Sequence, residues 1–470
     1  MPLILPGNVA TALGGAYEVA NSLRFDDGSS DYLNKTPSSA GSRTTWTWSA
    51  WVKRSDISPT NGMFEAYEDS NNFTYIRFAP SYIRIFNRIG GSTKAVYNTS
   101  AFYRDVSAWY HIVWIWDTTN GTAGNRSRLY INGTRVTNFS TETNPTSGEE
   151  SWINNNDAHY IGSTGVPSLY FNGYMSEVCF IDGTALEPTS FGEFDSDSPT
   201  IWKPIDVSDL TFGTNGFYLD FEDSSALGND VSGNNNDWTA NNLTAVDQST
   251  DTCTNNFATL NPLSSLTTSS QAFTEGNLVV TNSSGGMRQY NSTIAAATGK
   301  WYCEVKVTSV GGDAPGVGII DPSKFVYNSH IAGTNDGYCY LYGGNKQYNG
   351  SSVSYGDSWT TNDIIGIAMD LTNSKLYFSK NGTFQNSGDP TSGSTGTGSA
   401  YDIVSGVFYT FGGSTNDVNT DPVYSWNFGG TQSFTISSGN ADANGYGNFE
   451  YAVPSGYYAL NTKNLAEFGG

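Results

Sequence analysis

The chain has 470 residues and a formal net charge of −22, from 22 lysines and arginines against 44 aspartates and glutamates. This balance repels phosphate backbones and anionic lipid surfaces, so the sequence predicts no nucleic-acid partner. No run of 18 apolar residues occurs, and no membrane insertion is expected. The 29 Tyr, 25 Phe and 12 Trp beside 52 Gly favour strands and turns and predict an all-β protein.

The first part of the chain is an arm followed by strand patterns. Residues 1–19 are rich in Gly and Ala without periodicity, and we expect an arm that docks on a neighbouring subunit. Residues 20–195 have the strand spacing of a β-sandwich. Within this range Trp46, Trp48 and Ala50 point to one face of a strand and Trp51 to the other. A strand with aromatic residues on both faces is predicted to be central in its sheet.

Residues 196–271 differ in composition from both flanks. Runs of Asn, Ser and Asp surround isolated apolar residues, which need somewhere to be buried. We therefore predict an extended connector packed on both domains. Regular strand patterns resume afterwards, and residues 272–470 are predicted to form a second sandwich with a C-terminal tail.

The two halves share one supersecondary unit. Each has a strand that ends in Asp, then a turn, then a strand containing Leu-Tyr that is closed by Asn-Gly. The first copy ends at Asn132-Gly133 and the second at Asn381-Gly382. Because Asn-Gly is the strongest short-range hairpin signal, each half is predicted to contain such a hairpin.

Several motifs resemble known domain families. Residues 109–117, Trp-Tyr-His-Ile-Val-Trp-Ile-Trp-Asp, and residues 128–133, Arg-Leu-Tyr-Ile-Asn-Gly, resemble a laminin G or pentraxin-type domain of the concanavalin A-like class over 20–195. A second set of blocks resembles a SPRY domain over 272–460. These blocks are 299–305, 316–319, 363–370, 376–382 and 426–434. The resemblance implies two antiparallel jelly-roll β-sandwiches in tandem.

The connector and the end of the chain resemble structural proteins of marine bacteriophages. The matching segments are 215–221, 232–239, 251–262 and 454–465. The family usually has Pro where Cys253 stands. This resemblance implies a virion protein, such as a tail fibre, spike or capsid decoration protein, on the surface of an extracellular particle. It would be a homo-oligomer, with a trimer favoured, whose arm contacts other virion proteins and whose sandwiches adhere to a host surface glycan or receptor.

The sequence predicts no enzyme. Glycoside hydrolases of the concanavalin A-like class carry Glu-x-Asp-x-x-Glu on one strand, and this triplet is absent. The nearest acidic cluster contains Pro and Gly and is expected to be a solvated turn; its members are Glu187, Glu193, Asp195 and Asp197. The histidines, His111, His159 and His330, accompany no nucleophile elbow and are expected to be packed or hydrogen-bonded. A virion-associated polysaccharide-degrading enzyme and a secreted lectin-like protein remain the alternatives.

No cofactor is predicted, although calcium has one candidate turn. Calcium takes oxygen donors, and Asp69, Asn71 and Asn72 offer them in one loop. The second loop expected by analogy, residues 162–168, holds no carboxylate, so an ordinary turn is the alternative. The cysteines lack metal spacing and are expected to be buried free thiols; they are Cys179, Cys253, Cys303 and Cys339.

Loop aromatics of the second half suggest a sugar site. Sugar rings stack on aromatic faces, and their hydroxyls need fixed acceptors. The candidate residues are Tyr327, Asn328, Asp336, Tyr338, Tyr348 and Trp359. The alternative is that Tyr338 and Tyr340 belong to the core of a strand.

Overall fold

The structure is a computed structural model that describes residues 17–57, 59–265, 271–283, 286–311, 315–333, 337–417 and 421–469. The described residues divide into two compact units, the first ending at Thr254 and the second beginning at Asn255. Of the predicted arm, only residues 17–19 lie within the described ranges. No helix in those ranges has the length and apolarity needed to cross a membrane.

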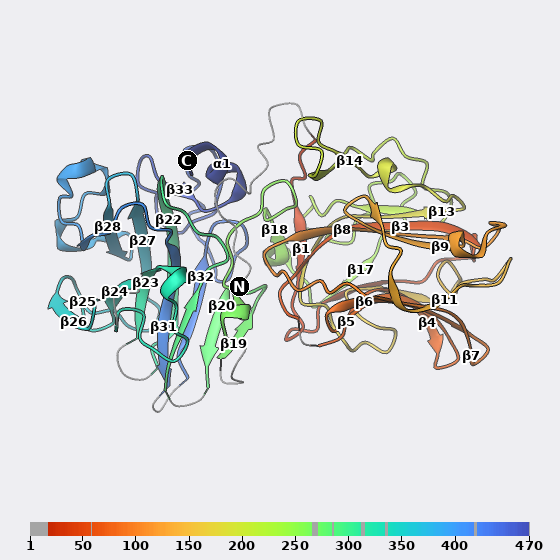
Figure 1. The fold of residues 1–470 in the computed structure, drawn as a ribbon, viewed down its shortest axis with the longest axis horizontal. Coiled ribbons are helices and arrows are strands. Elements are labelled where there is room, and N and C mark those ends of the chain that lie inside the picture. The colour runs from red at the N-terminus through yellow and green to blue at the C-terminus, as the bar shows by residue number, and fades with distance from the viewer. Residues whose placement is uncertain are drawn as a thin grey trace. The chain divides into compact units, whose positions relative to one another are not determined.

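The first unit is a sandwich of two sheets that lie face to face (Figure 1). The β3 sheet has the order β10-β9-β8-β3-β13-β1-β18, and β16 pairs with β13. Its strands are β1 (Ser22–Phe25), β3 (Thr45–Arg54), β8 (Trp109–Asp117), β9 (Ser127–Ile131), β10 (Thr134–Arg135), β13 (Gly173–Asp182), β16 (Phe217–Leu219) and β18 (Gln248–Ser249).

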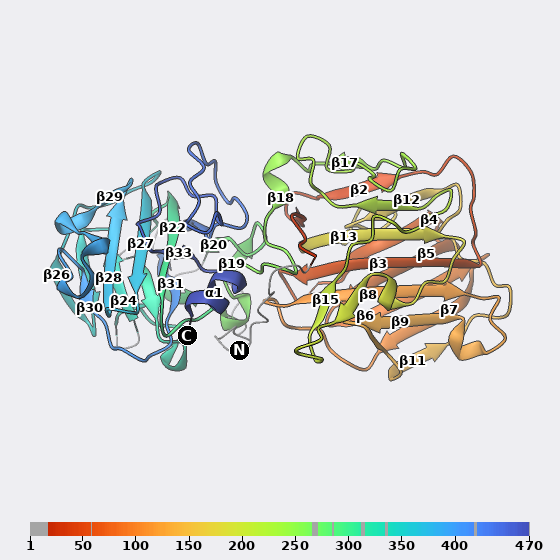
Figure 2. The same cartoon turned by 90° about the horizontal axis from the view of Figure 1, so that it is seen from above.

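The second layer, the β5 sheet, has the order β11-β7-β6-β5-β4-β12-β2-β17. Its strands are β2 (Tyr32–Lys35), β4 (Asn61–Asp69), β5 (Asn72–Ala79), β6 (Tyr82–Ile89), β7 (Ser92–Thr99), β11 (Phe139–Thr143), β12 (Ala158–Ile161) and β17 (Thr239–Asn241). Seen from above, the strands of the two layers run in similar directions (Figure 2). A separate hairpin joins β14 (Gly192–Phe194) to β15 (Trp202–Pro204).

The core of the first unit lies between these sheets. Trp46 and Trp48 on β3 are fully buried beside Trp116 and Trp114 of β8, their cross-strand partners. The Trp46 and Trp114 rings meet edge to face at 4.6 Å between centroids, an arrangement that favours aromatic pairs. Trp51 packs on the other side of the sheet. The central position predicted for this strand is confirmed.

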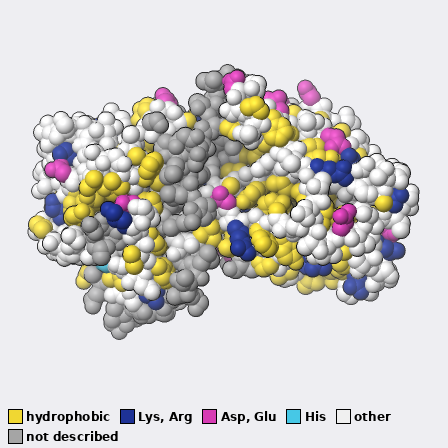
Figure 3. All heavy atoms as spheres, in the orientation of Figure 1, with side chains coloured by type: hydrophobic (Ala, Val, Ile, Leu, Met, Phe, Trp, Pro, Cys, Tyr) yellow, Lys and Arg dark blue, Asp and Glu magenta, His cyan; other side chains and the backbone are white. Residues whose placement is uncertain are grey.

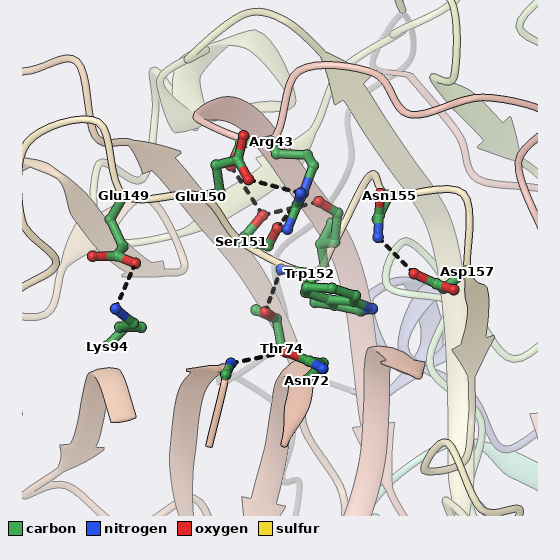
Figure 4. Close-up of polar contacts among 12 residues, drawn as sticks. Arg43, Asn72, Thr74, Lys94, Glu149, Glu150, Ser151, Trp152, Asn155 and Asp157 are labelled. Atoms are coloured by element: carbon green, nitrogen blue, oxygen red, sulfur yellow. Dashed lines mark hydrogen bonds and ion pairs between the residues drawn. The ribbon is translucent and has the colours of Figure 1, made fainter. Parts of the chain in front are cut away.

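One loop bonds both layers of this sandwich. Figure 4 shows this loop, residues 149–157, with Glu149, Ser151 and Trp152 among its labelled side chains. The Trp152 N–H donates to Thr74 Oγ1 of the β5 sheet at 2.7 Å. Ser151 Oγ accepts a hydrogen bond from Trp46 Nε1 of the β3 sheet at 2.8 Å. The Arg43–Glu150 ion pair, at 2.7 Å, and the Lys94–Glu149 pair, at 3.4 Å, flank this loop.

The segment predicted as a connector contributes strands to these sheets. Through β16, β17 and β18 it pairs with β13, β2 and β1. Two buried ion pairs fix it, Arg24–Asp247 and Lys53–Asp251, each at 2.7 Å. From Asn255 onward the segment belongs to the second unit, where Leu260 is fully buried.

The second unit is also a two-layered sandwich. The β27 sheet has the order β19-β20-β32-β22-β27-β28-β29, with β30 beside β28 and β33 beside β22. Its strands are β19 (Gln271–Thr274), β20 (Val279–Asn282), β22 (Lys300–Ser309), β27 (Ile364–Asp370), β28 (Lys375–Lys380), β29 (Thr383–Phe384), β30 (Tyr401–Asp402), β32 (Val423–Asn427) and β33 (Tyr458–Ala459).

The β24 sheet of this unit has the order β21-β31-β23-β24-β25-β26. Its strands are β21 (Gly286–Asn291), β23 (Gly316–Ile320), β24 (Gly337–Leu341), β25 (Asn345–Tyr348), β26 (Ser351–Ser354) and β31 (Thr410–Asp417). Helical structure in the described ranges comprises α1 (Thr462–Phe468) and short 3-10 turns. These turns are η1 (Ala123–Asn125), η2 (Pro188–Ser190), η3 (Ala245–Asp247), η4 (Pro262–Ser265), η5 (Pro322–Lys324), η6 (Gln385–Ser387) and η7 (Pro390–Thr395). The predicted fold class, two all-β sandwiches in tandem, is confirmed.

The repeated hairpin has the same local geometry in both units. Asn132 and Asn381 have φ values of 47° and 49°, and each is followed by a glycine with positive φ. Asn132 Oδ1 accepts a hydrogen bond from the His111 N–H, and Asn381 Oδ1 accepts one from the Ile364 N–H, both at 2.8 Å. Both Asn-Gly turns therefore close a hairpin, as predicted.

Candidate functional site

The outer face of the β5 sheet carries a cluster of aromatic and charged side chains. Along β5 and β6, alternate residues such as Ile76 and Ile85 point into the core between the sheets. The residues between them point away from it. With two residues of β4 they form what we call the open-face cluster: Glu65, Tyr67, Phe73, Tyr75, Arg77, Arg84, Phe86 and Arg88.

Rings at the centre of this cluster lie nearly parallel. The Phe73 and Tyr75 planes differ by 3° with centroids 5.8 Å apart, and Phe73 and Phe86 differ by 19° at 5.6 Å. Tyr67 continues the row, 6.2 Å from Phe73. Tyr75 is buried by its neighbours, whereas Phe73 and Phe86 are half-buried. The cluster therefore presents apolar ring surface on the side of the sheet that the core does not use.

Arginines flank these rings. The Arg77 Cζ lies 4.0 Å from the centre of the Tyr75 ring, and the Arg84 Cζ lies 5.1 Å from that of Phe86. Both distances are within the range of cation–π attraction. Arg88 is the cross-strand partner of Phe73 at the other end of the row. The positive charges are thus held beside the aromatic surface.

Glu65 is the carboxyl group of this cluster. It is only 4 % exposed, and burial raises its pKa to about 8, an effect that the nearby Arg77 charge partly offsets. At neutral pH this carboxyl is therefore mostly protonated. Glycoside hydrolysis needs two carboxyl groups across the scissile bond. The open-face cluster contains one, Glu65.

A loop after β12 forms a wall at one side of the cluster. A Cβ added to Gly165 would lie 1.9 Å from the Tyr67 Cβ, so the loop backbone runs directly against this side chain. Two apolar side chains of the same loop, Val166 and Leu169, are 62 % and 43 % exposed. The wall limits the open face to the region over β4, β5 and β6 and adds apolar surface to its edge.

The structure brings two of the predicted sugar-site tyrosines together, but inside the sandwich. Tyr338 and Tyr348 stack at 4.4 Å with an angle of 5° between their planes, and Tyr401 and Tyr409 complete the group. Tyr338 is 5 % exposed and Tyr340 is fully buried. Burial raises the pKa of Tyr338, whose hydroxyl bonds to those of Tyr348 and Tyr409. The alternative that Tyr338 and Tyr340 belong to the core is confirmed.

The other predicted residues of that site lie elsewhere. The Tyr327 carbonyl accepts the Gln289 N–H of β21, which lies four strand spacings, about 19 Å, from β25. Asn328 beside it is exposed. Trp359 is 2 % exposed and packs against Tyr340, so its ring is not available to a surface ligand. Asp336 lies outside the described residues.

The candidate calcium turn is exposed and internally hydrogen-bonded. Asp69 Oδ1 accepts the Asn71 N–H at 2.8 Å, and Asn72 Oδ1 accepts the Gly90 N–H at 2.9 Å. These oxygens thus already serve the two hairpin turns. Over the part of the chain that the structure describes, no group of three or more His, Cys, Asp or Glu side chains is placed to hold a metal ion. Calcium binding at this turn stays a prediction.

The acidic cluster and the histidines have structural partners. Glu187 pairs with Arg128, and Lys203 lies 3.2 Å from both Glu193 and Asp195. Asp197 is exposed. Glu187, Asp195 and Asp197 lie outside the strands, as expected, whereas Glu193 lies on β14 and pairs with Lys203 of β15, so the prediction of a single solvated turn was wrong for this residue.

Hydrogen bonds also account for the imidazoles. Trp202 Nε1 donates to His111 Nδ1, and the Asn154 N–H donates to His159 Nε2, both at 2.9 Å. Burial lowers the pKa of His111 to about 3 and that of His159 to about 4. His330 Nδ1 accepts the Ala332 N–H at 3.1 Å. The expectation of packed or hydrogen-bonded histidines is confirmed. The four cysteines are free, and all except the half-buried Cys253 are buried.

Comparisons with known proteins define the class of each unit. Residues 27–189 match the family model described as the concanavalin A-like lectin/glucanases superfamily, and residues 300–405 match the SPRY domain model. The chain therefore carries a concanavalin A-like domain followed by a SPRY domain. Domains of these types suggest non-catalytic binding.

Individual relatives cover only parts of the chain. Ran-binding protein 9 from Danio rerio and from Homo sapiens are each 34 % identical over 94 residues, 19 % of this chain. The match covers 15 % and 12 % of their lengths, respectively. Among solved structures, a putative carbohydrate-binding protein from Bacteroides ovatus is 16 % identical with a TM-score of 0.32, over 48 % of this chain and 59 % of that one. The SPRY domain of human HERC1 is 18 % identical with a TM-score of 0.27, over 33 % and 91 %.

Sequence reasoning missed the open-face cluster. The signal is present in two short runs, where Phe73, Tyr75 and Arg77 alternate with core residues, as do Arg84, Phe86 and Arg88. Aromatic and arginine residues on the face opposite the aliphatic ones mark a sheet surface that does not pack on the core.

Proposed function

We propose that this chain is a non-catalytic binding protein whose concanavalin A-like domain holds glycans on the open-face cluster. The observation that carries the proposal is the row of parallel rings at Tyr67, Phe73 and Phe86, on the face of the β5 sheet that does not pack on the core. Aromatic faces stack on the apolar faces of sugar rings, and the neighbouring arginines supply hydrogen-bond donors for hydroxyls.

Substitution of the central ring tests this site. We expect Phe73→Ala to lower glycan affinity about tenfold, since one aromatic contact contributes roughly 1.4 kcal/mol. The full chain would be screened on a glycan array, and isothermal titration calorimetry would follow with the glycans that bind. Phe102→Ala is the matched control, because Phe102 is 62 % exposed and lies outside the cluster. Absence of any glycan binding, or an equal loss in both variants, would refute the proposal.

We further propose that the protein belongs to a bacteriophage virion, as a tail fibre, spike or capsid decoration protein that adheres to the host surface. The support is the resemblance of segments 215–221, 232–239 and 251–262 to phage structural proteins. A surface with few charges suits an extracellular particle, and charged side chains are sparse on the face seen in Figure 3. Residues 1–19 would contact other virion proteins, and the chain would form a homo-oligomer, with a trimer favoured.

Particle composition tests the virion role. Mass spectrometry of purified particles should detect the chain, and immunogold labelling should place it on their surface. Deletion of residues 1–19 should abolish its incorporation. Detection only as a free secreted protein would favour the lectin-like alternative. Release of reducing ends from host polysaccharide by the purified chain would favour the polysaccharide-degrading enzyme.

A further inference from the structure

The arginines of the open-face cluster differ from all others in the chain. Every other arginine donates a hydrogen bond to a neighbour or forms an ion pair with one. Arg43, for example, pairs with Glu150 at 2.7 Å (Figure 4). The rest of this paired group is Arg24, Arg54, Arg104, Arg126, Arg128, Arg135 and Arg288. Arg77, Arg84 and Arg88 are bonded to no carboxylate or carbonyl of the described residues.

Two of these unpaired charges are direct neighbours. Arg77 and Arg84 are cross-strand partners on β5 and β6, a position in which Cβ atoms lie about 5 Å apart. Like charges directly opposite each other destabilise a sheet. The chain has twice as many acidic as basic residues, 44 against 22, yet among the described residues no carboxylate forms an ion pair with Arg77 or Arg84; the neighbouring carboxyl group is Glu65. An external anion would remove the repulsion.

The side chains are already held in place. Arg77 lies over Tyr75 and Arg84 over Phe86, so their guanidinium groups are positioned before any ligand arrives. Their ε-nitrogens are shut off from water without an acceptor, a cost that no contact of the described chain recovers. Guanidinium groups have planar donor geometry that matches carboxylate and sulfate oxygens.

The acidic side chain of the cluster does not neutralise them. Glu65 is neighboured by Arg77, but burial keeps it mostly protonated at neutral pH. As a neutral acid it adds no negative charge that would repel an anion. The cluster thus has net positive charge on a protein whose total charge is −22.

We infer that the glycan bound on this face is anionic, and that Arg77, Arg84 and Arg88 bind its carboxylate or sulfate groups while the rings contact the sugar. This inference rests on the proposed function and specifies the ligand class for the same site. Uronic acids and sulfated sugars share the required chemistry, namely anionic oxygens on a ring with an apolar face. Binding through the arginines needs no metal ion.

The test compares matched polymers on the full chain. Dextran and dextran sulfate share a backbone and differ in charge, hyaluronan oligosaccharides supply carboxylates, and poly-γ-glutamate is an anion without sugar rings. We expect dextran sulfate or hyaluronan to bind at least about tenfold more tightly than dextran, with unchanged affinity in EDTA. The double variant Arg77→Gln/Arg84→Gln should lose about tenfold or more of that affinity. The control Arg104→Gln/Arg135→Gln removes the same charge from exposed positions of the same domain and should change it less than about twofold.

The outcomes separate this inference from the proposed function. Binding of dextran or another neutral glycan in preference to both acidic ones overturns the anionic assignment and leaves glycan binding intact. Failure of every saccharide to bind overturns the proposed function. Equal binding of poly-γ-glutamate, or equal losses in the two double variants, shows charge attraction without sugar recognition and overturns the inference. Loss of binding in EDTA also overturns it, because the anion would then be held by a metal ion.

Discussion

Both domains contain a group of aromatic rings with a cationic side chain beside one ring. The two groups differ in whether that cation donates a hydrogen bond within the fold. In the SPRY domain Lys346 lies 5.1 Å from the Tyr401 ring centre, and its Nζ donates to the Ala400 carbonyl. The Tyr401 hydroxyl donates to the Cys339 carbonyl at 2.9 Å. In the concanavalin A-like domain, Arg77 lies 4.0 Å from a ring centre and bonds to no acceptor of the described chain.

This difference distinguishes a packing cluster from a binding surface. The SPRY tyrosines lie between two sheets, where an unpaired polar group costs free energy, and their hydroxyls and Lys346 are paired within the fold. The open-face cluster lies on the outer face of one sheet, where no second sheet of the described residues covers it, so its donors are left for a partner. Aromatic residues alone therefore do not mark a binding site; in this comparison the distinguishing feature is a set of unpaired arginines on an outer sheet face.

The largest contrast should appear in stability. Tyr338→Ala removes a buried ring from the SPRY core and should lower the free energy of unfolding of that domain by about 3–5 kcal/mol. Phe73→Ala removes a half-buried ring from an open face and should cost about 1 kcal/mol. Urea unfolding of the full chain, monitored by tryptophan fluorescence and by limited proteolysis, measures both losses of stability. Equal losses would mean that the open face is packed as a core and would contradict the comparison.

The sequence predicted the features that depend on local pattern. Alternation along residues 45–52 indicated a central strand, and Asn132-Gly133 and Asn381-Gly382 indicated hairpins, because strand faces and tight turns depend on neighbouring residues. The internal correspondence between the halves followed from the same short signals. Fold class needed only these patterns and composition.

The candidate site depended on contacts that sequence spacing does not encode. The pairing of Arg77 with Arg84 follows from the turn at Pro80-Ser81, which lacks a strong hairpin signal. Tyr338 and Trp359 could have belonged to loops or to core, because their burial depends on whether the second sheet covers them. The ion pair Lys53–Asp251 joins residues 198 positions apart, so no local pattern predicts it.

Replacing Lys346 in the SPRY domain and Arg84 in the open-face cluster should change the free energy of unfolding by intermediate amounts. Lys346→Met loses the bond to the Ala400 carbonyl and leaves that acceptor in a partly buried place, so we expect a loss of about 1 kcal/mol in the SPRY domain. Arg84→Gln removes a like-charge neighbour of Arg77 and should leave stability unchanged or raise it by a few tenths of a kcal/mol. The same urea titrations measure both. A loss of more than about 1 kcal/mol in Arg84→Gln would make its guanidinium a structural group and would count against an anion site.

The smallest expected effect concerns pH. Below about pH 8 Glu65 is protonated and does not compete for Arg77; above it the carboxylate forms and attracts that guanidinium, as an anionic ligand would. The side chains facing Glu65 are Arg77, Tyr75 and Tyr160, and burial raises the pKa of both tyrosines, so neither ionises in this range. Affinity for dextran sulfate should therefore fall roughly fivefold, or about 1 kcal/mol, between pH 7 and pH 9.

Glu65→Gln should remove this decline and keep the affinity at pH 9 near its value at pH 7, because the glutamine stays neutral. Glu68→Gln is the matched control, since Glu68 lies on the same strand in the exposed turn and bonds to Asn72 at 2.9 Å. It should retain the decline. If the affinity of Glu65→Gln still falls between pH 7 and pH 9, the titrating group lies outside the open-face cluster. The protonation of Glu65 would then not be what keeps Arg77 available to the ligand.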